Sequence, residues 1–309
     1  MARELTFRTA SPDDAQTAST ILTTALQDLA RRQGRPAPGM VEDAATPVMS
    51  HLIDTDAGRF WLAAEGRRVV GFGAGWVRGE LGYCGGLFVL PAWQGQGVGS
   101  RLFELAVAGM PANGAVALTS SAANPVSNRL YGRHGVYPFF ALLTMAGPAT
   151  APADAAHEGD DDGLAAEPLT PDSLGDLRRI DEAVLGVDRT PDHRWFLGGA
   201  GDEGWLFRRD GVVAGYAYLG GDRIEGAGQV GPLSALRAED QPGMLRFALA
   251  RLAARGVPEA RVLVPGPAVA AQRVLWEAGF SFTDVAGLLC ASRPFGHFDR
   301  YLLAGDALL

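Results

Sequence analysis

The feature that most constrains the fold of this chain is an internal repeat. Each half opens with a short apolar segment and a helix-start signal, Ser11-Pro12-Asp13 in the first half and Thr170-Pro171-Asp172 in the second. Each half continues with two apolar segments around a turn of glycine and charged residues, near Trp61 and near Trp205. The matching features keep a nearly constant offset along the chain, so a duplicated α/β unit is the simplest explanation.

The rest of each half repeats one order of elements: strand, amphipathic helix, strand, short helix and closing strand. In the first half we expect them at Tyr83–Leu90, Gly99–Ala108, Ala115–Ser120, Pro125–Arg133 and Phe139–Met145. In the second half we expect them at Gly228–Leu236, Pro242–Arg255, Ala260–Val264, Ala268–Glu277 and Phe282–Ser292.

The stretch between Gly147 and Pro168 separates the two halves. It is rich in Ala, Pro, Gly and acidic residues, and it carries no periodic apolar pattern. We therefore predict one domain at residues 1–146, a linker at 147–166 and a second domain at 167–309.

Composition excludes several classes of function. The chain has 35 acidic against 27 basic residues and a formal net charge of -8, which argues against a general nucleic-acid binder. No apolar run approaches the roughly 20 residues of a membrane span, and the N-terminus lacks the apolar stretch of a signal peptide. We expect a cytoplasmic protein that binds neither nucleic acid nor membrane. Cys84 and Cys290 lack metal-ligand spacing, so we predict two buried thiols and no metal site.

The segment LFVLPAWQGQGVGSRL, residues 87–102, is a strand that runs into a glycine-rich turn and a helix. A P-loop would need a lysine, which the chain lacks, and the alternating Gly95, Gly97 and Gly99 do not fit Gly-x-Gly-x-x-Gly. The remaining interpretation is Gln94-x-x-Gly97-x-Gly99, with Gly97 and Gly99 permitting positive φ where a pyrophosphate meets a helix N-terminus. A hairpin turn whose glycines only relieve crowding is the alternative.

This segment resembles the acetyl-CoA signature of the GNAT (Gcn5-related N-acetyltransferase) superfamily. Downstream, NPVSNRLYGRHGV at 124–136 resembles the second motif of that family, Asn-x-x-Ala-x-x-Leu-Tyr-x-x-x-Gly-Phe, with Ser127 in place of Ala and Val136 in place of Phe. The resemblance covers most of residues 1–146. It implies an α/β (α+β) fold of two GNAT-like domains, each with a mixed, mostly antiparallel central sheet flanked by helices.

The resemblance also implies a site for acetyl-CoA as cosubstrate, without a metal. The main chain of Leu87 and Val89 would bind pantetheine and polarise the thioester carbonyl. Tyr131 would protonate the leaving thiolate, with aromatic packing as the alternative, and Asn124 would either hold pantetheine or cap its helix. The implied coenzyme-binding residues are Leu87, Phe88, Val89, Gln94, Gly95, Gln96, Gly97, Val98, Gly99, Ser100, Asn124, Ser127 and Tyr131.

The sequence does not identify a general base. Several relatives have a Glu where this chain has Tyr83, Glu80 is expected in a solvated turn, and His134 lies at the far end of its short helix. A water chain is an equal alternative. The acceptor side should include residues 31–35, whose arginines suit either an anionic acceptor or a solvated loop, and residues 138–140.

The second half lacks the signature. In place of the glycine turn it has RAEDQPG at 237–243, whose two acids would repel a pyrophosphate and whose Pro242 removes an N–H donor. The positions that match the motif's Tyr and Asn are Leu275 and Ala268. We therefore predict a degenerate GNAT repeat with an architectural role.

One further stretch, IDEAVLGVDRTPDHRWF, resembles a segment of some tandem GNAT proteins. It contains Asp181, Asp188, Arg189 and Trp195. We expect its charged residues to cap a helix and a loop, and we attach no chemistry to it.

These features together predict an N-acetyltransferase. The first domain would transfer the acetyl group of acetyl-CoA to a primary amine, of a small molecule or of a protein, by direct attack, and the second would be structural. Cys84 gives no indication of a covalent intermediate. A non-catalytic acyl-CoA-binding regulatory module is the alternative, and a role in protein interaction alone is a third possibility. We expect a monomer or a homodimer.

Overall fold

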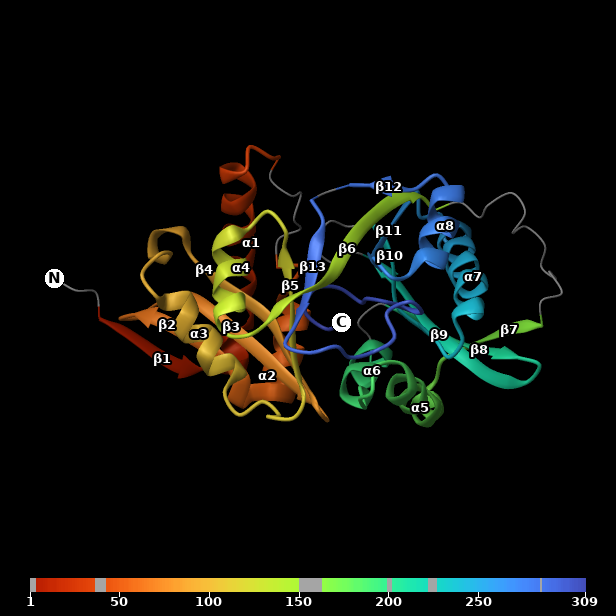
Figure 1. The fold of residues 1–309 in the computed structure, drawn as a ribbon, viewed down its shortest axis with the longest axis horizontal. Coiled ribbons are helices and arrows are strands. Elements are labelled where there is room, and N and C mark those ends of the chain that lie inside the picture. Colours follow the sequence, from red (N-terminus) through yellow and green to blue (C-terminus); the bar gives the residue numbers. More distant parts are fainter. Residues whose placement is uncertain (1–3, 37–42, 150–162, 199–201, 222–226, 284) are drawn as a thin grey trace.

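The computed structural model describes residues 4–36, 43–149, 163–198, 202–221, 227–283 and 285–309 (Figure 1). The first half contains α1 (Ala15–Arg32), α2 (Thr46–Asp56), α3 (Val98–Val107), α4 (Pro125–Arg133), β1 (Leu5–Thr9), β2 (Phe60–Glu65), β3 (Arg68–Arg78), β4 (Leu81–Val89), β5 (Ala115–Ser121) and β6 (Tyr137–Pro148). The second half contains α5 (Leu174–Val184), α6 (Thr190–Leu197), α7 (Gln241–Ala254), α8 (Val269–Glu277), β7 (Leu164–Pro168), β8 (Glu203–Arg209), β9 (Val212–Gly221), β10 (Gly228–Ala235), β11 (Glu259–Pro265), β12 (Ser281–Phe282), β13 (Gly287–Ala291) and β14 (Tyr301–Leu302).

The two helix-start signals of the sequence form as expected. Ser11 and Asp14 make a reciprocal capping box, and Thr170 and Ser173 make the equivalent one 159 residues later. In both, a proline occupies the first helical positions, where its missing N–H is not needed. The repeat read from the sequence is therefore present in the local structure of each half.

One mostly antiparallel sheet runs through both halves, in the order β1-β2-β3-β4-β5-β13-β6-β11-β10-β9-β8-β7. The closing strands are exchanged: β13 of the second half lies between β5 and β6, and β6 of the first half pairs with β11 (Figure 1). The boundary predicted at residue 146 falls inside β6, and residues 150–162 of the predicted linker lie outside the described residues. The two halves therefore share hydrogen-bonded strands, and the domain limits stay a prediction.

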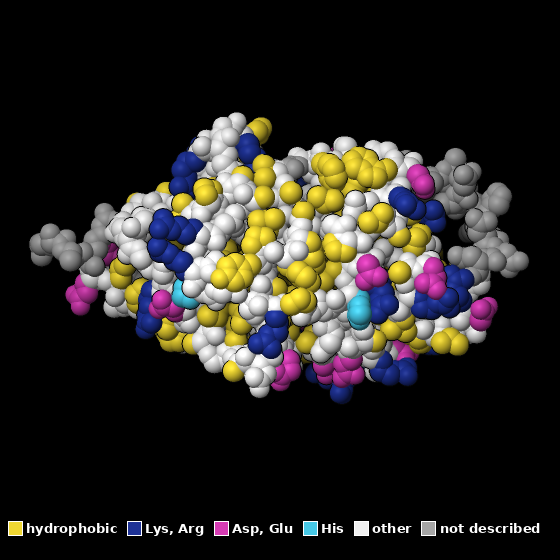
Figure 2. Space-filling model, in the orientation of Figure 1, with side chains coloured by type: hydrophobic (Ala, Val, Ile, Leu, Met, Phe, Trp, Pro, Cys, Tyr) yellow, Lys and Arg dark blue, Asp and Glu magenta, His cyan; other side chains and the backbone are white. Residues whose placement is uncertain are grey.

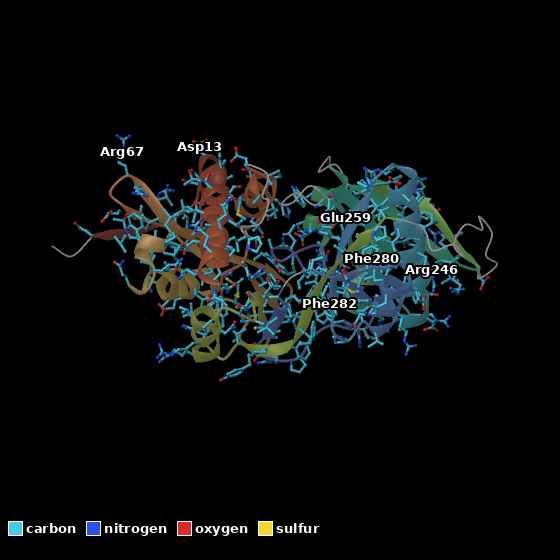
Figure 3. All side chains as sticks on the ribbon, turned by 90° about the horizontal axis from the view of Figure 1, so that it is seen from above. Asp13, Arg67, Arg246, Glu259, Phe280 and Phe282 are labelled. Carbon is cyan, nitrogen blue, oxygen red and sulfur yellow. The ribbon has the colours of Figure 1, made fainter. Side chains whose placement is uncertain are left out.

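Helices cover both faces of the first-half sheet. Helices α1 and α2 pack on one face with the aromatic side chains of β3, and α3 and α4 pack on the other (Figures 1 and 3). In the second half, α7 and α8 cover one face, while α5 and α6 join the apolar core that contains α1 and α2. The largest core of the molecule therefore spans the junction between the halves.

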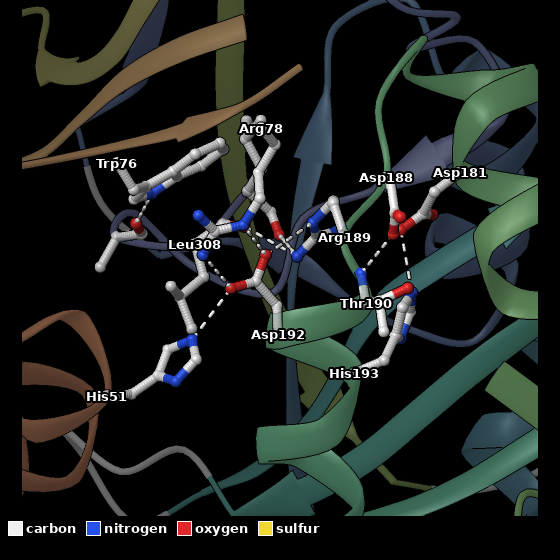
Figure 4. Close-up of polar contacts among 12 residues, drawn as sticks. His51, Trp76, Arg78, Asp181, Asp188, Arg189, Thr190, Asp192, His193 and Leu308 are labelled. Carbon is white, nitrogen blue, oxygen red and sulfur yellow. Dashed lines mark hydrogen bonds and ion pairs between the residues drawn. The ribbon is translucent and has the colours of Figure 1, made fainter. Parts of the chain in front are cut away.

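A buried carboxylate joins the halves at this junction (Figure 4). Asp192 of α6 is 1% exposed, and it accepts hydrogen bonds from Arg78 of β3 at 2.8 and 3.2 Å and contacts His51 Nε2 of α2 at 2.9 Å. Arg189 approaches the same carboxylate at 3.5 Å. Burial alone would raise the pKa of Asp192, but the hydrogen bond from His51 and the charges of Arg189 and Arg78 hold it well below its ordinary value.

The charged segment around Arg189 differs in part from the sequence expectation. Asp188 does cap the start of α6, accepting a hydrogen bond from Thr190 N at 2.8 Å. Asp181 and Arg189 are instead completely buried. Asp181 accepts a hydrogen bond from Tyr216 at 2.6 Å, and Arg189 donates to Leu308 O at 2.8 Å. The sequence did not predict this burial, because a charged residue that is buried and paired cannot be distinguished in sequence from a solvated one.

We predict that Arg78→Met destabilises the protein strongly. The change keeps the apolar stem but leaves Asp192 and Asp56 with one cationic partner fewer in a desolvated site. Loss of one member of a buried ionic cluster costs about 3–5 kcal/mol, and urea unfolding measures it.

The control is Arg101→Met, which breaks an exposed pair with Glu104 and should leave the urea midpoint unchanged. A loss below about 1 kcal/mol for Arg78→Met, in the range of surface pairs, would show that the cluster does not hold the halves together.

Candidate active site in the first half

A fork in the sheet is the first element of the site. Strands β4 and β5 are paired in parallel from Leu81 with Ala115 to Cys84 with Leu118. Beyond that point β4 follows β3 to Val89, whereas β5 turns away to follow β13. No strand of the described residues fills the gap. The two strands therefore splay apart beyond Cys84 and Leu118.

The glycine turn lies at the open end of the fork. Gly95 and Gly97 have φ values of 74° and 83°, and a Cβ at either position would meet nothing within 4 Å. Gly99, expected to have positive φ, instead belongs to the first turn of α3. The helix begins at Val98, one residue earlier than predicted, so the left-handed pair is Gly95 and Gly97.

Two glutamine side chains hold this turn in place. Gln94 Nε2 donates to Val89 O at 2.8 Å, and its Oε1 accepts from Arg32 of α1 at 2.9 Å. Gln96 Nε2 donates to Ala92 O at 2.9 Å. Both side chains therefore brace the loop. The first N–H groups of α3 lack partners within the helix, and N–H groups in this position can bind an anion.

Four further predicted coenzyme-binding residues, Leu87, Phe88, Val98 and Ser100, lie on β4 and α3. Leu87 packs against both apolar clusters of this face, one with Val98 and one with Tyr131. Phe88 points to the opposite face, where its ring lies 5.5 Å from that of Phe72. Ser100 is half-buried in the first turn of α3. The structure thus brings Leu87, Val98 and Tyr131 together and separates Phe88 from them.

Tyr131 lies on α4 at the base of the fork. It is 6% exposed, its ring centroid is 5.4 Å from that of Phe103, and it shares a cluster with Cys84 and Cys290. Burial raises the pKa of Tyr131, and a hydrogen bond with Ser127 opposes this in part. The phenol therefore stays protonated, as a proton donor requires. The packing alternative of the sequence is observed, and the role of Tyr131 as an acid stays a prediction.

The two cysteines are inert thiols. Burial raises the pKa of Cys84 to about 12 and that of Cys290 to about 11. The thiolate is the nucleophilic form, so neither side chain is activated for covalent catalysis.

Asn124 caps α4. Its side-chain oxygen accepts a hydrogen bond from Ser127 N at 3.3 Å. Neighbouring Asn128 ties the same helix to β5 through Ser120 and Ser121, at 2.7 and 3.1 Å. The cap is thus observed, and a contact of Asn124 with pantetheine stays a prediction.

The two side chains considered as bases, Glu80 and His134, are both exposed. Glu80 is exposed in the turn before β4, at the closed end of the fork, and His134 is exposed with its ring edge on Phe103. Arg31 and Arg32 pair with Asp28 on the exposed side of α1.

The C-terminal segment is the part of the site that the sequence did not reveal. Asp306 O accepts hydrogen bonds from Tyr83 of β4 at 3.0 Å and from Thr119 of β5 at 3.2 Å, so it bridges the two prongs of the fork. The next carbonyl, Ala307 O, accepts from Trp76 at 2.9 Å. Nothing in the local pattern GDALL signals such a contact, because the partners lie more than 180 residues away in the chain.

The equivalent fork of the second half is filled. Strand β10 pairs with β11 only over Gly228–Val230, and β14 then pairs with β10 at Leu233 and Ser234. The turn after β10 holds a buried carboxylate, Asp240, paired with Arg209 at 2.6 Å. The chain thus occupies its own second cleft, in agreement with the loss of the signature there.

Two other kinds of feature are absent from the described residues. Within these ranges, no helix is long and apolar enough to cross a membrane. The same residues contain no group of three or more His, Cys, Asp or Glu side chains placed to hold a metal ion.

Comparisons with known proteins agree with this geometry. Residues 24–136 match the model of the acetyltransferase (GNAT) family, and a search of curated proteins found no match. Among solved structures, a candidate acetyltransferase of Pyrococcus horikoshii is 16% identical with a TM-score of 0.74, covering 100% of this chain and 97% of its own. A GCN5-related N-acetyltransferase of Sphaerobacter thermophilus is 17% identical with a TM-score of 0.64, covering 97% and 99%. A tandem GNAT protein of the clavulanic acid pathway is 17% identical with a TM-score of 0.58, covering 94% and 99%.

These likenesses establish the fold over the whole chain and the family over part of it. The GNAT fold supports acetyl transfer in general, and proteins of this family use acetyl-CoA. The resemblance read from the two sequence motifs is confirmed: residues 24–136 match the model of the acetyltransferase (GNAT) family, within a fold that the chain shares along its length with solved GNAT structures.

Proposed function

We propose that this protein is an acetyl-CoA-dependent N-acetyltransferase that acts on a primary amine by direct attack. The observation that carries the proposal is the conjunction of an open fork, an open glycine turn at its mouth and a buried phenol at its base. These are the parts needed to bind a pyrophosphate, to seat a thioester and to protonate a departing sulfur.

The residues present fit acetyl-CoA. Gly95 and Gly97 leave open space above the turn, and α3 offers its N-terminal N–H groups and the positive end of its dipole to a pyrophosphate. The edge of β4 at Leu87–Val89 pairs with no strand among the described residues, although Val89 O accepts from Gln94, and it suits the amide groups of pantetheine. Ser100, Asn124 and Ser127 complete the proposed coenzyme contacts.

The proposed chemistry needs few groups. Bound acetyl-CoA supplies an activated thioester, and the main chain of the β4 prong polarises its carbonyl. Tyr131 donates its proton to the leaving sulfur. Direct attack is supported by the two cysteines, since both are buried thiols with raised pKa values and neither is activated as a nucleophile.

In this proposal residues 1–146 are the catalytic domain, 147–166 the linker and 167–309 a structural domain. The filled fork of the second half and the exchanged strands support that division of roles. The second half then serves the reaction by shaping the first.

The proposed partners are a small-molecule or protein amine, with neither nucleic acid nor membrane, in the cytoplasm and without a metal. The protein would be a monomer or a homodimer. Figure 2 shows apolar side chains gathered along the middle of one face, over β6 and towards α8 and β12. The exposed large apolar residues of these three elements are Tyr137 and Phe139 on β6, Trp276 on α8 and Phe282 on β12. In a homodimer this face would be the one covered.

A non-catalytic acyl-CoA-binding module is the second candidate. The nearly complete burial of Tyr131 among Phe103 and two thiols favours it, because a purely structural tyrosine would occupy the same place. The two candidates differ in turnover and agree in coenzyme binding.

We predict that the wild type binds one acetyl-CoA per chain and that Gly97→Trp abolishes binding. An indole at a position with φ of 83° would fill the space left for the pyrophosphate. Calorimetric titration measures both affinity and stoichiometry. Gly66→Trp is the matched control, because Gly66 also has positive φ (59°) and open space but lies in the β2–β3 hairpin. Two molecules per chain, or unchanged binding by Gly97→Trp, would refute the assignment of the site.

We predict that Tyr131→Phe lowers kcat about 100-fold, the usual scale of general acid catalysis, while the Kd for acetyl-CoA stays unchanged. The readout is release of the coenzyme A thiol with spermidine, tyramine, glucosamine and a lysine-containing peptide as acceptors. Tyr137→Phe, an exposed tyrosine on β6, is the control. Wild-type protein that binds acetyl-CoA but turns over none of these amines would favour the binding module.

A further inference from the structure

The C-terminal segment visits the forks of both halves in turn. Leu303 pairs with Leu263 beside the filled fork of the second half, and Asp306 then bridges the prongs of the open fork in the first. Ala304 N donates to Leu309 O at 2.9 Å, which closes this segment into a turn. The position of Asp306 is therefore set by both halves together.

Asp306 and Tyr131 lie on opposite faces of the same fork. Successive side chains of a strand point to opposite faces. Cys84 points to the face of α3 and α4, where it clusters with Tyr131, and Tyr83 points to the other face, where it bonds to Asp306 O. A thioester carbonyl seated in the fork would have the phenol on one side and Asp306, anchored there through its main-chain oxygen, on the other.

Solvent reaches the Asp306 side chain, and the segment that carries it is fixed in place. The side chain is exposed to solvent, whereas Leu308 and Leu309 beside it are buried and fixed through Arg189. The protein on the inner side of the segment desolvates the carboxyl in part, and this raises its pKa. A carboxylate with a raised pKa takes up a proton more readily than a fully solvated one.

The other groups around Asp306 do not compete for this role. Tyr83 and Tyr301 are buried with raised pKa values and stay neutral. Trp76 is a donor to Ala307 O, and Arg189 is bound to the carbonyls of Leu308 and Leu309. Asp306 therefore supplies the carboxylate on the face of the fork opposite the phenol.

We propose that Asp306 is the general base of acetyl transfer, so that the second half adds one catalytic group to its structural role; the inference rests on the N-acetyltransferase function proposed above. An N–H bond of the acceptor ammonium breaks, its electron pair stays on nitrogen, and the proton passes to the Asp306 carboxylate and on to solvent. The amine attacks the thioester carbon and the C–S bond breaks. The sulfur takes the proton of Tyr131, the nitrogen loses its second proton through Asp306, and solvent returns a proton to Tyr131.

The variant Asp306→Asn tests this assignment. The anchoring bonds to Tyr83 and Thr119 use the main-chain oxygen, so the amide keeps the shape of the segment. Asp299→Asn is the matched control, since Asp299 is an exposed acid of the same C-terminal segment. Asp306→Glu keeps the carboxylate and should recover part of the rate.

We expect Asp306→Asn to leave the Kd for acetyl-CoA unchanged and to lower kcat about 100-fold at neutral pH. The loss should shrink as pH rises, because the amine then arrives without its proton. Titrating the best acceptor of the amine panel into the coenzyme A complex should show binding about tenfold weaker, from the lost charged hydrogen bond.

The other possible outcomes distinguish failure of the assigned base from failure of the proposed function. An active wild type with equally active Asp306→Asn overturns the assignment of the base and leaves the proposed function intact. A loss that is constant with pH and accompanied by weaker acetyl-CoA binding also overturns it, because that is the signature of a structural contact. A wild type that binds no acetyl-CoA removes the proposed function, and this inference with it.

Discussion

The arrangement of this molecule depends on one desolvated carboxylate. Asp192 is held between Arg78 and His51 of the first half and Arg189 of its own half. Because an unpaired charge at such a depth is far more costly than an exposed one, the two halves are favoured in a single relative placement. Arg189 extends the cluster to Leu308 and Leu309, so the same ionic group also positions the C-terminal segment.

Because of that placement, the forks of the two halves differ although the halves are repeats of one unit. Both halves contain a bulge where the fork opens, at Gly85 and at Gly231. A Cβ at Gly85 would lie 2.6 Å from Ala307 O, and one at Gly231 would lie 2.2 Å from Leu303 O. The C-terminal segment thus passes both bulges at backbone distance, which requires glycine at each. In the second half the C-terminal segment fills the fork. In the first half it lies on the face of Tyr83 and does not cover the face of Tyr131.

Local features were predictable from the sequence because neighbouring residues determine them. The helix Pro125–Arg133 has the expected limits, and the two capping boxes form at the expected places. The expected strand Phe282–Ser292 is instead divided into β12 and β13, which pair with different parts of the sheet. Strand exchange was invisible because an apolar strand has the same pattern whichever partner it finds. Asp306 was missed for a related reason: its contacts lie in the other half.

The most direct test of the account is hydrogen–deuterium exchange of the full chain with and without coenzyme A. We expect slower exchange at residues 85–100, where the fork and the glycine turn lie, and at 304–309, which bridge the prongs. Residues 231–243 should be unaffected, because the chain already occupies that fork. Protection at 231–243, or none at 85–100, would contradict the assignment of a single working site in the first half.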